Sequence, residues 1–216
     1  MDRIHRDILR CVLPFATWLG LQSLLPSEAW AYAVRTVATA AVGIACLKGA
    51  ETRGGLGWRG AALGAALGIA VCALWIAPES SAWYRAHLCW PAAPEPKTSP
   101  YDPASCGWTL TCLKLFGSAF VIAPVEEVFF RSFLYRWLQR RDFTSVPLSR
   151  FDLSAFLWTV LLFTLEHDRP AVAALAGALY GFAAIRLGLG AAIVAHMVTN
   201  LALGLYVIRC DAWGFW

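Results

Sequence analysis

Seven apolar segments, separated by polar stretches, follow one another along the 216-residue chain. Most approach the ~20 residues that a helix needs to cross the hydrocarbon core of a bilayer. Because no water is available there, each segment must satisfy its own backbone amides, as a helix does. The pattern predicts an all-α, polytopic transmembrane helical bundle of about seven helices (six to eight). The segments cover residues 11–25, 29–47, 60–77, 109–139, 152–166, 171–187 and 189–208.

Composition supports a lipid bilayer as the surroundings. Hydrophobic residues make up 59% of the chain and charged residues 15%, whereas soluble domains carry roughly 25% charged residues. The net charge of +4 comes from scattered basic residues. A nucleic-acid-binding surface would instead concentrate them in a stripe or patch. We therefore expect no nucleic-acid partner.

A proline-rich stretch divides the chain. Five further prolines follow Pro78 before residue 107, and proline cannot continue a helix. We expect an external loop here, with N-terminal transmembrane helices and the loop in residues 1–108 and a second unit in residues 109–216. Cys89 and Cys106 flank the loop. If the loop faces an oxidising compartment, a disulfide between them is a hypothesis.

The basic residues indicate the orientation, because Lys and Arg accumulate in cytoplasmic loops. With the N-terminus in the cytoplasm, most of them fall on the inner side. An alternative is a cleaved signal peptide ending near Ala31. The apolar pattern resumes directly after a turn at Pro26, which favours an uncleaved first span. The outer side then receives only Arg85, Lys97, Arg169 and Arg209.

Two adjacent glutamates, Glu126 and Glu127, lie inside the fourth apolar segment. Ionisable residues at that depth are costly and indicate a functional site by default. Glu127 and Arg131 are four residues apart, so on a helix they can pair. Glu126 points in a different direction and is the candidate general base, and Pro124 predicts a kink that would admit water. The alternative is a charge cluster at a helix end.

Polar residues interrupt two later apolar segments as well. Phe163 and His167 lie one helical turn apart at the end of the fifth segment, and His196 and Asn200 share one face of the last. Each has a structural alternative. His167 could be an interfacial residue, and His196 or Asn200 could form a hydrogen bond between membrane helices.

Together these spacings resemble a known family. The ordered set Glu126-Glu127-x-x-x-Arg131, Phe163-x-x-x-His167 and His196-x-x-x-Asn200 resembles the three motifs of the CAAX-protease and bacteriocin-processing (Abi) membrane proteins, over about residues 109–208. The sequence around His167 and His196 and the tail ending in Trp216 are similar to short bacterial CAAX-protease-like proteins associated with exosortase sorting. Many relatives have an apolar residue at the position of Glu166, which leaves its role open.

The resemblance implies a CAAX-type intramembrane glutamate endopeptidase of the bacterial inner membrane, with residues 109–216 as its catalytic core. Glu126 with His167 would activate water, while His196 with Asn200 would stabilise the oxyanion. The implied substrate is a membrane-anchored peptide or protein, with exosortase-system components as possible partners. Supporting positions are Glu127, Arg131, Phe163 and Glu166.

Three alternative interpretations assign other roles to the same residues. Two histidines and a glutamate could hold zinc with an open position for water, but His-Glu-x-x-His is absent, and the resemblance implies no metal or other cofactor. A non-catalytic membrane partner, such as an immunity or assembly factor, would use these side chains as a structural network. A proton-coupled transporter should show two related halves, and the sequence has no such symmetry.

Overall fold

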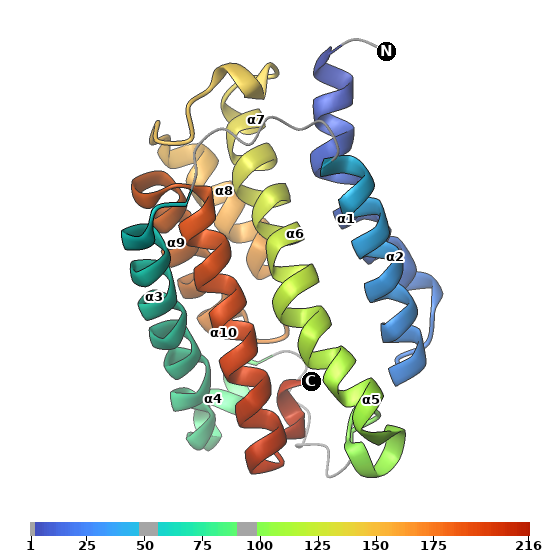
Figure 1. Ribbon diagram of the computed structural model, residues 1–216. Coiled ribbons are helices and arrows are strands. Elements are labelled where there is room, and N and C mark those ends of the chain that lie inside the picture. Colours follow the sequence, from blue (N-terminus) through green and yellow to red (C-terminus); the bar gives the residue numbers. More distant parts are fainter. Residues whose placement is uncertain (1–2, 48–55, 90–98) are drawn as a thin grey trace.

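The computed structural model describes residues 3–47, 56–89 and 99–216, which form a bundle of helices (Figure 1). The regular structure of these residues is entirely helical, which confirms the predicted all-α bundle. The helices are α1 (Arg3–Leu24), α2 (Ala29–Leu47), α3 (Trp58–Ile76), α4 (Ala82–His87), α5 (Pro103–Phe116), α6 (Ala123–Glu127), α7 (Tyr135–Gln139), α8 (Leu153–Thr164), α9 (Pro170–Leu187) and α10 (Leu189–Cys210).

Every predicted apolar segment contains a helix, but the helices differ in whether they are long and apolar enough to cross a membrane. Within the described part of the chain, five spans are long and apolar enough. Helix α8 has 12 residues, or roughly 18 Å, short of the ~30 Å hydrocarbon core. Helix α1 begins with charged turns. The five spans are Ala29–Cys46, Trp58–Ser80, Pro103–Gln139, Pro170–Leu187 and Leu189–Cys210.

The rod formed by α5, α6 and α7 runs through the middle of the bundle (Figure 1). Helices α1 and α2 form an antiparallel hairpin on one side of it, as the sequence predicts. Helix α10 contacts the other side of the rod and packs against α3 and α9. The C-terminus lies away from the N-terminus, in the other half of the bundle. The predicted orientation of these halves in the membrane stays a prediction, and Lys97, one of its outer charges, lies outside the described residues.

Helix α5 begins at Pro103, six residues before the predicted segment. The Asp102 side chain accepts a hydrogen bond from the Ala104 amide at 2.9 Å and caps the new end. Proline suits the first turn of a helix, where its missing N–H has no intrahelical partner anyway. Gly107, with φ of 78°, then interrupts the helical geometry. Treating every proline as a helix breaker was therefore wrong at Pro103.

Pro124 produces widened helical turns within a continuous rod. Residues Gly117–Ile122 (η2) and Val128–Leu134 (η3) are π-helical and flank the short α6. Proline lacks an N–H and its ring crowds the carbonyl four residues earlier. In the π-helical turn before it, the Ala123 amide donates to the Ser118 carbonyl, five residues back. Both glutamates lie in α6, between the two π-helical segments.

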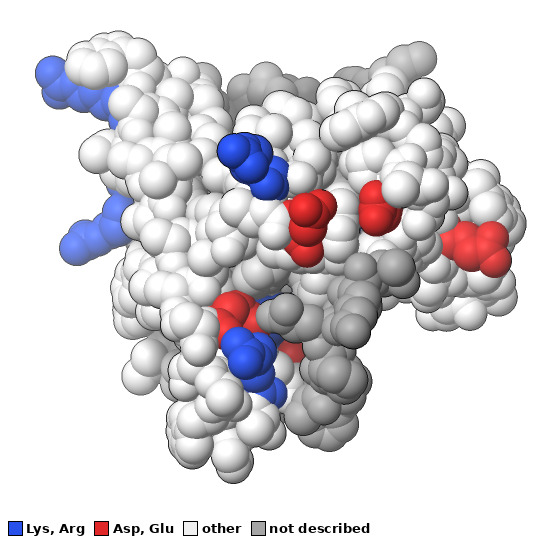
Figure 2. All heavy atoms as spheres, turned by 90° about the horizontal axis from the view of Figure 1, so that it is seen from below, with Lys and Arg blue, Asp and Glu red and all other residues white. Residues whose placement is uncertain are grey.

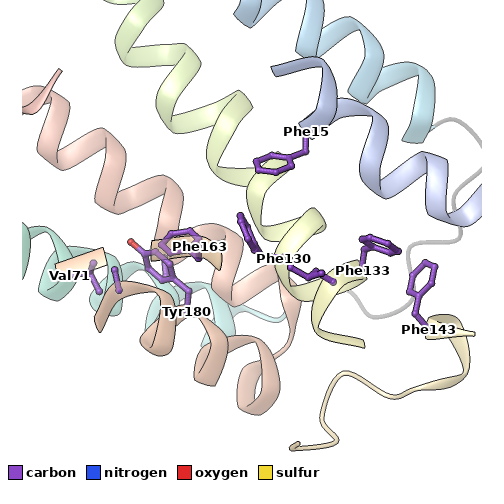
Figure 3. Close-up of a cluster of buried hydrophobic side chains, with 10 residues drawn as sticks. Phe15, Val71, Phe130, Phe133, Phe143, Phe163 and Tyr180 are labelled. Carbon is purple, nitrogen blue, oxygen red and sulfur yellow. The ribbon is translucent and has the colours of Figure 1, made fainter. Parts of the chain in front are cut away.

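An aromatic cluster packs around the second half of the rod (Figure 3). The Phe130 ring lies 5.5 Å from that of Phe15 in α1 and 5.3 Å from that of Phe163 in α8. Phe133 contacts Phe143 edge-on at 5.2 Å. These contacts tie α1 and α8 to the rod and so fix the position of the glutamates one turn before Phe130.

Helices α3 and α10 approach each other at glycines. A Cβ atom on Gly68 would lie 2.4 Å from the Ala195 carbonyl oxygen, and one on Gly64 would lie 2.5 Å from the Ala191 carbonyl oxygen. Thr199 also donates a hydrogen bond to the Gly68 carbonyl at 2.9 Å. Small residues at this spacing allow membrane helices to pack closely, and here they hold the helix that carries His196.

Replacing Gly68 by alanine should lower the free energy of unfolding by about 1–3 kcal/mol, because the added methyl group meets backbone that cannot move alone. Denaturant titration in mixed micelles measures this loss. Gly43→Ala in α2 is the matched control, since nothing lies within 4 Å of its Cβ position. Equal stability of the two variants would show that the α3–α10 contact is not tight.

The hypothesis of a Cys89–Cys106 disulfide is wrong for this structure, in which both cysteines are free. The two thiols have other neighbours. The Cys89 Sγ lies 3.9 Å from a carboxylate oxygen of Glu79, and the Cys106 Sγ lies 3.6 Å from the Thr111 hydroxyl. Each thiol thus belongs to a different end of the loop.

Candidate active site

A cavity of about 220 Å³ lies between the central rod, α3, α9 and α10. All four residues predicted to be catalytic line it, although they come from three distant parts of the sequence. The structure thus brings Glu126, His167, His196 and Asn200 together. The other lining residues are Trp75, Lys114, Ser118, Phe163, Asp168, Arg169, Ala176, Tyr180, Leu203, Phe215 and Trp216.

Both glutamates contact the same imidazole. The His196 Nδ1 lies 3.1 Å from Oε1 of Glu127, and the His196 Nε2 lies 3.6 Å from Oε2 of Glu126. A carboxylate only accepts hydrogen bonds, so Glu127 places a proton on Nδ1. The other ring nitrogen then faces Glu126. The resemblance had suggested a partnership of Glu126 with His167, whereas in the described residues Glu126 directly contacts His196.

Glu127 and Arg131 form the predicted pair inside the protein. The Arg131 Nε lies 3.4 Å from Oε2 of Glu127, and the two side chains are 2% and 0% exposed. Arg131 also donates from Nη2 to the Gly177 carbonyl at 3.1 Å. Its guanidinium lies 4.9 Å from the centre of the Phe163 ring. The paired arginine keeps Glu127 ionised in an apolar setting.

Tyr180 is a site residue that the sequence analysis missed. Its ring stacks on that of His196 with centroids 4.7 Å apart and planes at 19°. The Tyr180 hydroxyl donates to the Thr199 hydroxyl at 2.8 Å, and Thr199 donates onward to Gly68 of α3. A tyrosine within the otherwise apolar segment 171–187 was the available signal. This chain of contacts fixes the plane of the imidazole.

The orientation of the His167 ring is fixed by a hydrogen bond to the backbone at the end of the preceding helix, α8. Its Nδ1 lies 2.8 Å from the Phe163 carbonyl oxygen, which can only accept, so Nδ1 carries the proton. Burial lowers the pKa of His167 to about 4. The ring is therefore neutral at pH 7, and its Nε2 is a hydrogen-bond acceptor.

Asn200 is oriented by the rod. Its Nδ2 donates to the Ser118 carbonyl at 3.0 Å, in the π-helical segment η2. The same carbonyl accepts the Ala123 amide. An amide nitrogen has two N–H groups, so the second one remains available in the cavity.

The two remaining supporting residues behave differently. The Phe163 ring lies 4.6 Å from that of His167 and 5.9 Å from that of His196, so it packs beside both. Glu166 is exposed and is not among the residues lining the cavity.

The cavity extends to Phe215 and Trp216, close to the C-terminus. There, Arg169 joins three segments. Its Nε lies 2.6 Å from a carboxylate oxygen of Glu79, its Nη2 donates to the Gly214 carbonyl at 2.9 Å, and its guanidinium lies 4.6 Å from the centre of the Phe215 ring. Seen from this end, separate acidic and basic groups interrupt a largely uncharged surface (Figure 2).

The zinc alternative requires three or more ligands within reach of one ion. Among the residues that the structure describes, no group of three His, Cys, Asp or Glu side chains has a suitable arrangement. The nearest candidate is the His196 imidazole between the two glutamates, and one of these carboxylates already pairs with Arg131.

Comparison with known proteins supports the motif analysis. Residues 108–202, which include all four predicted catalytic residues, match the family model described as type II CAAX prenyl endopeptidase Rce1-like. No curated protein and no solved structure matches the chain. Five apolar spans and this match indicate an integral membrane protein. Residues 108–202 of the chain are thus similar to the Rce1-like family of type II CAAX prenyl endopeptidases.

Proposed function

We propose that this protein is an intramembrane endopeptidase that uses glutamate-activated water to cleave a membrane-anchored peptide or protein. The observation that carries the proposal is the single cavity lined by Glu126, His167, His196 and Asn200. Hydrolysis needs a base, a water and hydrogen-bond donors for the oxyanion within one small volume. The lining side chains supply the base and the donors.

The cavity suits a reactive water. Its volume of about 220 Å³ exceeds the share of a single water, and its polar lining offers several hydrogen-bond partners. Glu126 and the unprotonated Nε2 of His167 are both acceptors, so a water between them donates one hydrogen to each. The water oxygen is then left with its lone pairs free to attack a carbonyl carbon.

Proton transfer completes the reaction. The attacking water gives a proton to Glu126 as its oxygen bonds to the carbonyl carbon. When the C–N bond breaks, Glu126 returns this proton to the departing amine. The net reaction consumes one water and yields a carboxylic acid and an amine, with the glutamate restored.

His196 and Asn200 face the oxygen that becomes negative. The free N–H of Asn200 is one donor. The second is an N–H at Nε2 of His196, whose ring lies between the two carboxylates. Donors held in place before the reaction stabilise an oxyanion without further reorganisation.

The substrate class follows from the membrane setting and from the sequence resemblance. We place the protein in the bacterial inner membrane with its N-terminus in the cytoplasm. In this orientation, the half of the bundle that contains the cavity faces the outer leaflet. Cargo of exosortase-type sorting systems is the first group of membrane-anchored substrates to test.

Hydrolysis can be tested with the purified protein in lipid nanodiscs. Membrane-anchored peptides, with cargo peptides of sorting systems among them, are incubated in ¹⁸O-labelled water, and products are identified by mass spectrometry. We expect new carboxyl termini carrying one ¹⁸O atom, and activity that survives a strong chelator. Zinc present in stoichiometric amount and lost together with activity would contradict a metal-free mechanism.

The same measurement addresses the non-catalytic alternative. An immunity or assembly factor would generate no new termini with any peptide. The buried network of Glu127, Arg131 and His196 would then serve packing alone. Cleavage by the wild-type protein but not by the His196→Ala variant would exclude this alternative.

A further inference from the structure

Lys114 lines the catalytic cavity, and its side-chain amine has no acidic partner among the ion pairs of the described residues. Its Nζ instead lies near three aromatic rings, 4.1 Å from the centre of Tyr32, 4.7 Å from that of Tyr101 and 5.9 Å from that of Trp216. Aromatic faces attract a cation, but they leave its three N–H donors largely unused.

An unpaired ionisable group inside a membrane helix is costly and indicates function by default. The nearby charged side chain does not lower the free-energy cost of burying Lys114. Arg35 is 6% exposed and lies 5.4 Å from the same Tyr32 ring, so the second charged group here is also positive. Lys114 therefore gives this end of the cavity a basic group, whereas Glu126 gives the other end an acidic one.

The two ends are separated along one helical rod. Lys114, Ser118 and Glu126 all line the cavity from the same rod. Twelve residues separate Lys114 from Glu126, which corresponds to roughly 18 Å along a helix. Since a fully extended peptide advances ~3.3 Å per residue, at least about five residues are needed to span this distance. Asn200, bonded to Ser118, lies between the two ends.

We propose that Lys114 binds an anionic group, a carboxylate or a phosphate, of the substrate or of the lipid beside it. This inference rests on the proposed function and adds a specificity determinant to it. If the anion belongs to an extended substrate, it lies about five residues or more from the peptide bond that reaches Glu126, so Lys114 selects which bond is cut. The aromatic rings around Lys114 provide an apolar wall for the chain that carries the anion.

Binding can be measured without any cleavage. Dodecanoate, dodecyl phosphate and neutral dodecanol, which share one chain length, are titrated against the protein in nanodiscs. We expect the two anionic compounds to bind wild-type protein and Lys114→Arg, and to bind Lys114→Met at least about 10-fold more weakly, as for loss of one charge-assisted hydrogen bond. Dodecanol should not distinguish the variants.

Arg209→Met is the matched control. Arg209 is exposed near the end of α10 and is absent from the cavity lining, so its loss removes a positive charge from the same half of the bundle. If Arg209→Met weakens anion binding as much as Lys114→Met does, or if neither variant changes it, the assignment to Lys114 is overturned.

Cleavage assays then identify the source of the anion. Carboxylates at about five or more residues from the cut bond are neutralised one at a time in a cleaved peptide, and the nanodisc lipid is either anionic or zwitterionic. A substrate carboxylate predicts a KM about 10-fold higher after neutralisation, with kcat little changed and no further effect in Lys114→Met. A lipid phosphate predicts that only the lipid matters, again through Lys114.

The two proposals can fail separately. Lys114-dependent anion binding without cleavage of any peptide would overturn the proteolytic function and retain the anion site. Cleavage that depends neither on substrate carboxylates nor on lipid charge would retain the protease and overturn the role of Lys114.

Discussion

Glu126→Gln should abolish cleavage while the protein remains folded. Glutamine matches glutamate in shape and still reaches His196, but it cannot take a proton from water. Loss of a general base costs about 10²- to 10⁴-fold in rate. We expect kcat to fall by this factor in the nanodisc assay, with substrate binding retained.

Two control measurements show whether the loss of activity in Glu126→Gln comes from the missing base. Unfolding titrations should show that Glu126→Gln is at least as stable as wild type, because burying a neutral amide costs less than burying a carboxylate. Glu28→Gln, at an exposed glutamate in the turn between α1 and α2, should retain full activity. If Glu126→Gln kept more than about a tenth of the wild-type kcat, another group would have to be the base.

The helices were predictable because local patterns determine them. Apolar runs near the length of a bilayer crossing identified all seven segments, and proline at position 124 marked a disturbance of the rod. The form of the disturbance was not predictable. Whether a proline kinks a helix or is followed by π-helical turns depends on the neighbours, here α10 and the aromatic cluster.

The site was partly predictable for the same reason. The spacings of Glu127 with Arg131 and of His196 with Asn200 place each pair on one helix face, which sequence alone reveals. Tyr180 and Lys114 carry no such local signal. Their importance depends on contacts with residues 13 or more positions away, such as His196 for Tyr180 and Tyr101 for Lys114.

The pairing of the glutamates also required the structure. The sequence predicted that the two glutamates point in different directions on the helix, and the resemblance implied that Glu126 acts together with His167. In the structure one imidazole lies between both carboxylates, because α10 packs against α6 and inserts His196 between their side chains. The rotation of one helix about its axis decides such a contact, and no local pattern encodes it.

Arg131→Met should destabilise the protein by about 3–5 kcal/mol. Glu127 is fully buried, and this variant leaves its carboxylate without the paired cation, while methionine fills much of the same volume. An uncompensated buried charge is strongly unfavourable. The free energy of unfolding, from denaturant titration in mixed micelles, measures the loss.

The double variant Arg131→Met, Glu127→Gln separates charge from packing. With the carboxylate also removed, no buried charge is left unpaired, so we expect most of the lost stability to return. Activity should not return with it, because glutamine at position 127 no longer fixes the proton on Nδ1 of His196. If the double variant were as unstable as Arg131→Met, the destabilisation would come from lost packing against Phe163 and the Gly177 carbonyl, and the ion pair would have no net effect on stability.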